Sequence, residues 1–163
     1  MILDLHWNSD DIEFKGEMAM RGSEAVGDSV DFWHSVADQF RDNELVFYEL
    51  FNEPHLQQEV TNDVYLRGDE TYAGMLELID TVRAHSQDQV LIIGGAKNWA
   101  YDTESLKELD ALTDDTLIMY NYHMYMHPGV QQDYKGKNVD RIEAHVIDIQ
   151  GATDKPTIFT EFG

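Results

Sequence analysis

The sequence predicts an α/β fold: a parallel sheet covered by helices, in the form of an incomplete (β/α) barrel of the TIM type. Two observations carry this prediction. Short apolar segments alternate with amphipathic ones along the 163 residues, which indicates parallel strands joined by right-handed crossovers. Polar residues also recur where the apolar segments end, which is the face on which β/α barrels build their active sites. Because no glycine-rich phosphate loop follows the first strand, an arc of a barrel is favoured over an open doubly wound sheet.

Five short apolar runs are expected to form the strands, because parallel strands that are covered on both faces are apolar throughout. They are residues 2–7, 45–50, 90–94, 116–122 and 157–161. A complete barrel needs roughly 250 residues. The sequence therefore predicts about five βα units, with residues 1–163 forming a single domain that is a fragment of such a barrel and lacks strands at both ends.

Apolar residues at helical spacing predict the helices between these strands. The expected helices cover residues 29–41, 70–86 and 139–149, and a shorter one follows Thr103. Either Asp28 or Ser29 is expected to cap the first of them, because a short polar side chain accepts hydrogen bonds from the free N–H groups of the first turn.

Composition and charge exclude several classes of partner. The chain has 32 acidic and 11 basic residues and a formal net charge of −21, so it is not expected to bind nucleic acid or an anionic membrane surface. It has no cysteine, which excludes disulfides and thiolate chemistry. No run of 18 apolar residues is present, so no membrane-spanning segment is expected. The oligomeric state is left open.

Strand parity predicts which polar side chains face the same side, because alternate residues of a strand point to the same face. The sets that share a side are Asp4 with His6, Asn121 with His123 and Tyr125, and Phe159 with Glu161. Each set ends with a polar residue at the carboxyl end of its strand. We therefore expect several hydrogen-bonding groups to point into one bowl.

Two glutamates at strand ends carry the chemical prediction. Glu53 precedes Pro54, which confines its backbone to the extended region and places its carboxyl at the rim of the sheet. Glu161 follows an apolar strand, where an acid is costly unless another group satisfies or uses it. Acidic residues before proline also occur in ordinary loops, so the triplet Asn52-Glu53-Pro54 alone is a weak indication of a catalytic site. Together, however, two converging carboxylates are what hydrolysis of a glycosidic bond requires.

Six stretches of the sequence carry a family resemblance: residues 2–7 (ILDLHW), 51–55 (FNEPH), 93–95 (IGG), 98–102 (NWAYD), 122–125 (YHMY) and 160–163 (TEFG). Through these stretches the sequence resembles glycoside hydrolase family 5, the cellulase family of β/α-barrel enzymes. The stretches cover nearly the whole chain, in the order in which barrel strands three to seven occur in the family. The family's arginine on the second strand and its aromatic residue on the eighth have no counterpart here, so the resemblance implies a catalytic-domain fragment.

The resemblance implies a role for each residue at the strand ends. Glu53 is implied to be the general acid/base and Glu161 the nucleophile, with Asn52 holding the 2-hydroxyl of the sugar. His6 and His123 are implied to line the subsite at the cleaved bond, and Tyr125 to donate a hydrogen bond to Glu161. Aromatic planes bind the apolar faces of pyranose rings, so Trp99 and Trp7 are candidate platforms, although either could instead pack under a loop.

The expected function is that of a retaining endo-β-1,4-glucanase, acting on a β-linked polysaccharide or oligosaccharide and secreted from the cell. A β-mannanase or mixed-linkage glucanase would share these catalytic residues, and an inactive barrel fragment that binds glycans weakly is the alternative from another class. His123 and His127 are four residues apart, but on a strand and turn this spacing does not indicate a metal site. No metal and no organic cofactor is expected.

Overall fold

A computed structural model describes residues 1–6, 21, 27–55, 61–97, 99–124, 143–144 and 146–162. Its sheet has five parallel strands in the order β1-β2-β3-β4-β5. The strands are β1 (Ile2–Asp4), β2 (Phe47–Glu49), β3 (Leu91–Ile93), β4 (Ile118–Met124) and β5 (Thr157–Phe162). Each lies within or overlaps one of the five predicted runs. The predicted order and direction of the strands are therefore confirmed.

Helices follow the strands as predicted, with one addition. They are α1 (Ser29–Phe40), α2 (Asn62–Arg67), α3 (Met75–Arg83) and α4 (Thr103–Asp110), and residues 146–152 are also helical. Asp28 is the cap of α1, where its side chain accepts hydrogen bonds from the N–H groups of Val30 and Asp31. The helix α2 was not predicted, because it is only six residues long and lies in an acid-rich stretch.

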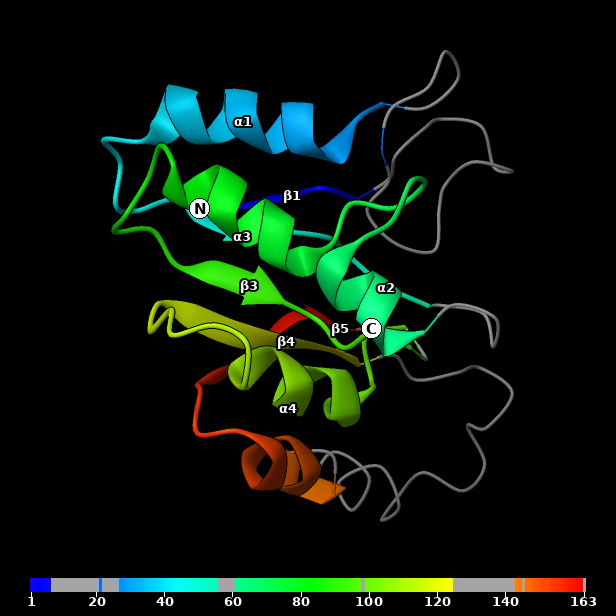
Figure 1. Cartoon of the computed structure of the whole chain (residues 1–163). Helices are drawn as coiled ribbons and strands as arrows, with labels where there is room; N and C mark the ends of the chain where they lie inside the picture. Colours follow the sequence, from blue (N-terminus) through cyan, green and yellow to red (C-terminus); the bar gives the residue numbers. More distant parts are fainter. Residues whose placement is uncertain are drawn as a thin grey trace.

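The outer face of the sheet packs against the helices (Figure 1). Tyr48 on β2 makes an edge-on contact with the buried ring of Trp33 on α1, with ring centroids 5.5 Å apart. On β4 the hydroxyl of Tyr120 donates to Asp110 at the end of α4, at 2.6 Å. Aromatic side chains thus join the strands to the helices on this face, and the polar side chains are left for the other face.

The inner face is curled, as a single hydrogen bond demonstrates. The hydroxyl of Thr160 on β5 donates to Oε1 of Glu49 on β2 at 2.9 Å. These strands are three positions apart in the sheet order, a span of roughly 14 Å in a flat sheet. Only a strongly curved sheet brings the two side chains into contact. The predicted arc of a β/α barrel is therefore confirmed, and the open doubly wound alternative is excluded.

A β-bulge in β5 changes one prediction of strand parity. Tyr122 pairs with Phe159, but His123 pairs with Glu161, so Thr160 is an extra residue on β5. Phe159 packs edge-on against Tyr122 of the outer face, whereas both Thr160 and Glu161 lie near His123. The prediction that Phe159 and Glu161 share a side is wrong, because a bulge shifts the alternation by one residue and re-aims the side chains that follow it.

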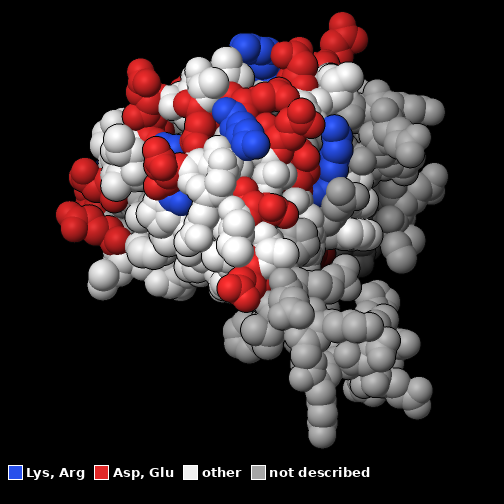
Figure 2. All heavy atoms as spheres, turned by 90° about the horizontal axis from the view of Figure 1, so that it is seen from below, with Lys and Arg blue, Asp and Glu red and all other residues white. Residues whose placement is uncertain are grey.

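Acidic side chains cover much of the surface, as the composition predicts. Figure 2 shows Asp and Glu spread over one face of the molecule with few Lys and Arg among them, consistent with the net charge of −21. Among the described residues, no helix is both long enough and apolar enough to cross a membrane.

Candidate active site

Glu53 lies in the segment that follows β2, and hydrogen bonds hold this segment on both sides. The N–H of Asn52 donates to the carbonyl of Leu5 at 3.2 Å, and the carbonyl of Pro54 accepts from the N–H of Ala100 at 2.9 Å. The side chain of Glu53 is 19% exposed. Glu53 therefore lies at the rim of the sheet, where the sequence predicts its carboxyl.

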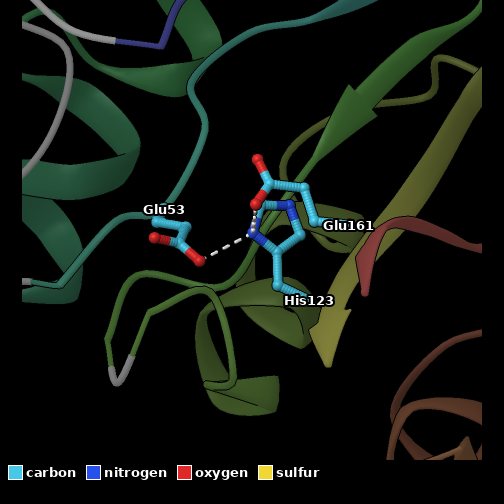
Figure 3. Close-up of side chains that lie close together, drawn as sticks. All are labelled: Glu53, His123 and Glu161. Atoms are coloured by element: carbon cyan, nitrogen blue, oxygen red, sulfur yellow. Dashed lines mark hydrogen bonds and ion pairs between the residues drawn. The ribbon is translucent and has the colours of Figure 1, made fainter. Parts of the chain in front are cut away.

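The structure brings Glu53 and Glu161 together around His123 (Figure 3). Nδ1 of His123 lies 2.8 Å from Oε1 of Glu53 and 3.8 Å from Oε2 of Glu161. One oxygen of each glutamate and one nitrogen of the histidine all lie within 4.8 Å of one another. Two carboxyls from β5 and from the end of β2 thus face a common point, 108 residues apart in the chain.

These three side chains are also of the types that bind cations, and they form the one such group among the described residues. The short contact between His123 and Glu53 already satisfies the ring nitrogen that faces the glutamates. Nothing in the arrangement therefore requires an ion, and we assign no metal to it.

His123 is fully buried and has polar partners on both ring nitrogens. Its Nε2 lies 2.8 Å from Oγ1 of Thr160 and 3.4 Å from Oε1 of Glu49. Burial acts to lower the pKa of His123, but the hydrogen bonds to Glu49 and Glu53 and the charge of Glu161 outweigh it and raise that pKa. The ring therefore holds a proton more strongly than a histidine in water.

A second histidine lies on the other side of Glu161. Nδ1 of His6 is 3.9 Å from Oε1 of Glu161 and 2.7 Å from Oδ2 of Asp4. The amide Nδ2 of Asn52 lies 3.4 Å from Nε2 of His6. Since an amide nitrogen can only donate, His6 accepts at Nε2 and donates from Nδ1 to Asp4. The predicted site residues His6, Asn52 and His123 therefore surround the two glutamates.

Asp4 has a perturbed carboxyl group at the edge of this cluster. Burial raises the pKa of Asp4 to about 6; the hydrogen bond from His6 opposes this rise, and the charge of Glu49 on the neighbouring strand adds to it. Its buried Oδ1 has no hydrogen-bond partner in the described part of the chain. A charge placed here is incompletely solvated, so it reduces stability when the carboxyl is ionised.

We expect the substitution Asp4→Asn to raise the free energy of unfolding at pH 7. Because the folded pKa lies above the ordinary value of 3.8, ionisation disfavours the folded state, by up to about 3 kcal/mol above pH 6. The gain should shrink as the pH falls from 6 towards 3.8 and vanish below 3.8, where the wild-type carboxyl is protonated in both states. Urea unfolding at pH 7, 5 and 4 measures it, with Asp88→Asn at an exposed position as the control. A loss of stability at pH 7 would contradict this interpretation.

Of the three aromatic residues predicted for the site, the structure describes one. Trp99 is 51% exposed and stacks on the imidazole of His55, with ring centroids 4.0 Å apart and planes inclined by 15°. Its backbone and that of Ala100 adopt positive φ angles of 60° and 69°, in a segment tied to Pro54 by the hydrogen bond from Ala100. Trp7 and Tyr125 lie outside the described residues.

Sequence reasoning missed the polar layer behind the site. Glu49, Thr160 and Asn121 connect three strands on the inner face. Asn121 was expected to share a side with His123, but Glu49 and Thr160 were not predicted to face the site. A signal was present for Glu49, since a carboxylate directly between the apolar residues Tyr48 and Leu50 must have partners inside the fold. Gly94 leaves room for this layer, because a Cβ there would lie 2.5 Å from Oδ1 of Asn121.

Comparisons with known proteins agree with this geometry. A family model described as cellulase (glycosyl hydrolase family 5) matches residues 1–163. Endoglucanase A of Butyrivibrio fibrisolvens is 35% identical over 103 residues, which is 63% of this chain and 21% of that protein.

Solved structures show the same fold. Endoglucanase Cel5A of Pseudomonas stutzeri superposes with a TM-score of 0.63 at 19% identity, over 99% of this chain and 50% of that one. XacCel5A, solved in complex with cellopentaose, gives a TM-score of 0.67 at 14% identity, over 99% and 52%. The chain thus spans about half of these two structures and about a fifth of the curated relative.

Proposed function

The chain belongs to glycosyl hydrolase family 5, the cellulase family, and we propose that its site hydrolyses β-1,4-linked glucan internally, with retention of configuration. The single observation that carries this proposal is the convergence of two carboxyls. Oxygens of Glu53 and Glu161 lie within 4.8 Å of each other, with His123 beside both. Retaining enzymes keep their two carboxyl groups about 5 to 5.5 Å apart, whereas inverting enzymes separate them by about 6.5 to 9.5 Å to admit a water.

In the proposed first step, Glu161 attacks the anomeric carbon while Glu53 protonates the departing oxygen. The bond from the sugar to the leaving group breaks, and a glycosyl ester forms on Glu161. Glu53 suits the proton donor because its carboxyl shares a short contact of 2.8 Å with a histidine nitrogen. Glu161 suits the nucleophile because its carboxyl lies between His6 and His123, with ring nitrogens 3.9 and 3.8 Å from its oxygens, and faces Glu53 across the site.

In the second step, Glu53 accepts a proton from water as the water displaces Glu161 from the sugar. The same residue thus serves as acid and then as base, as microscopic reversibility requires. Asn52 is proposed to bind the 2-hydroxyl of the sugar. Its Oδ1 has no hydrogen-bond partner among the described residues, so an acceptor remains for a substrate hydroxyl while Nδ2 faces His6.

The proposal of β-1,4-glucan as the substrate rests on the relatives. One relative is an endoglucanase, Endoglucanase A of Butyrivibrio fibrisolvens, and the similar structure XacCel5A was solved in complex with cellopentaose. A β-mannanase or a mixed-linkage glucanase would use the same pair of carboxyls. Because a polymer of this kind does not enter cells, we also propose that the protein acts outside the cell.

A panel of polysaccharides tests the proposed substrate. The purified chain is incubated with carboxymethyl cellulose, mannan and mixed-linkage β-glucan, and release of reducing ends is measured against viscosity. We expect hydrolysis of cellulose with a rapid fall in viscosity, because internal cleavage shortens chains early. Preferred hydrolysis of mannan would replace the proposed substrate and leave the mechanism intact. No hydrolysis of any glycan would support the alternative of an inactive fragment that only binds.

Trp99 is expected to contribute to substrate binding and not to the chemical step. An exposed indole held flat against His55 offers one face to a sugar ring, and aromatic contacts of this kind are worth about 0.5–1.5 kcal/mol. We expect Trp99→Ala to raise KM about threefold to tenfold with kcat unchanged. Steady-state kinetics on a cello-oligosaccharide measures this, with Trp99→Tyr as the control that keeps an aromatic face. An unchanged KM in Trp99→Ala would show that the ring does not contact substrate.

A further inference from the structure

Glu49 is a buried carboxylate to which the proposed hydrolysis gives no role. It is 3% exposed and lies on the inner face of the sheet at the end of β2. Its Oε1 accepts hydrogen bonds from Nδ2 of Asn121 and from Oγ1 of Thr160, the latter at 2.9 Å. A buried carboxylate is retained only where such partners compensate its lost hydration. These partners lie directly behind His123.

The direction of each hydrogen bond in this layer follows from the donors available. A carboxylate can only accept, so the single hydroxyl proton of Thr160 points to Glu49. The hydroxyl oxygen is then left to accept from Nε2 of His123, which lies 2.8 Å away. The amide Nδ2 of Asn121 also lies 3.3 Å from Nε2, but it donates to Glu49 in a much shorter contact, so the contact with Thr160 decides where the ring proton lies. Glu49 therefore requires, through Thr160, that the proton of a neutral His123 ring be on Nε2.

A fixed proton on Nε2 decides what the other side of the ring offers. Nδ1 then has a lone pair directed at Oε1 of Glu53, 2.8 Å away. Two acceptors approach this closely only with a proton between them, so Glu53 and His123 share one. Three charged groups face the ring of His123 from the packed strands. Glu49 lies near Nε2, and Glu53 and Glu161 lie near Nδ1.

We propose that Glu49 is a positioning residue: through Thr160 it fixes which ring nitrogen of His123 carries the proton, and so presents Nδ1 to Glu53. The inference rests on the proposed function, in which Glu53 is the acid that protonates the leaving group. A purely structural role, tying β2 to β4 and β5, would leave the choice of ring nitrogen undetermined. The raised pKa of His123 agrees with the proposal, since both ring nitrogens have carboxylates close by.

Nitrogen NMR of the wild-type chain tests the proposal directly. The ring ¹⁵N signals of His123, assigned by their loss in His123→Gln, distinguish Nε2–H from Nδ1–H in the neutral ring. We expect the Nε2–H form at a pH above the transition. The Nδ1–H form would overturn the proposal, because Thr160 would then donate to His123 and not to Glu49. This reading requires no turnover, so it does not depend on whether the chain hydrolyses glucan.

Two variants separate positioning from simple support of the fold. Glu49→Gln keeps an acceptor oxygen but removes the charge, and we expect it to lower the pKa of His123, because Glu49 is one of the groups that raise it. Thr160→Val keeps the shape but removes the hydroxyl, and we expect the Nε2–H form to lose its dominance. Thr160→Ser is the control that restores it. If both folded variants keep the wild-type tautomer and pKa, the proposal fails.

If the wild-type chain is active, steady-state kinetics tests the positioning role of Glu49 independently of the NMR signals. We expect kcat to fall about tenfold in Glu49→Gln and Thr160→Val, while KM stays near the wild-type value because neither side chain touches substrate. The pH profile of kcat should move with the pKa of His123. A fall in kcat that Thr160→Ser does not rescue would point to lost packing and would count against positioning.

Discussion

The substitution Glu161→Gln is expected to abolish hydrolysis, lowering kcat by about 10⁴-fold or more. An amide is nearly the size of a carboxyl but does not attack an anomeric carbon, so the glycosyl ester cannot form. Binding should persist, because the amide still fits beside His6 and His123, whose nitrogens lie 3.9 and 3.8 Å from the present carboxylate. Single-turnover kinetics and isothermal titration with cellotetraose measure the two effects separately.

The matched control for Glu161→Gln is the same substitution at a glutamate outside the site. Glu44 is exposed and lies in the loop before β2, and Glu44→Gln should retain wild-type kcat and affinity. If Glu161→Gln retains more than about a hundredth of the wild-type rate, Glu161 is not the nucleophile, because loss of a nucleophile leaves only the stabilisation from binding.

The substitution Glu53→Gln is expected to lower kcat by about 10²- to 10⁴-fold on a natural glycan. The loss should depend on the leaving group, which distinguishes the acid from the nucleophile. An aryl glycoside with an acidic phenol departs without protonation, so the first step should proceed in the variant and the glycosyl ester should accumulate. A rapid burst of phenol followed by slow turnover, measured by stopped-flow absorbance, is the predicted result.

Added azide should then restore turnover of Glu53→Gln, because an anion attacks the glycosyl ester without help from a base. Glu161→Gln provides the matched comparison, since it forms no ester for azide to attack. If the two variants respond alike to the leaving group and to azide, the roles assigned to the two glutamates are wrong.

Much of the fold could be predicted because its signals are local. Apolar runs between turn residues located all five strands, and helical spacing located α1, α3 and α4. The prediction of residues 70–86 as one helix extended too far at its start. Asp69 accepts hydrogen bonds from the N–H groups of Thr71 and Tyr72 and holds that segment as a turn before α3 begins at Met75. Such competition by a side chain is not visible in apolar spacing.

The site was predicted in part, and the missing part is non-local. Glu53 and Glu161 could be selected because each follows a strand and because the surrounding stretches resemble one family. The bulge at Thr160 could not be predicted, since nothing in the residues of β5 alone indicates where the strand has one residue more than its partner β4. Its consequence is large: Thr160 contacts Glu49 and His123, and Glu161 also faces His123. Pairing with β4 decides this, not the sequence of β5.

A mechanism-based trap tests the central claim most directly. A 2-fluoro cellobioside with a good leaving group forms the glycosyl ester quickly and hydrolyses it slowly, because the fluorine destabilises both oxocarbenium-like transition states and the leaving group accelerates only the first. Mass spectrometry of the digested protein then locates the sugar. We predict one adduct, on the peptide that contains Glu161, and its absence in Glu161→Gln. An adduct on another residue of the active protein, or a first product of inverted configuration by proton NMR, would contradict the account.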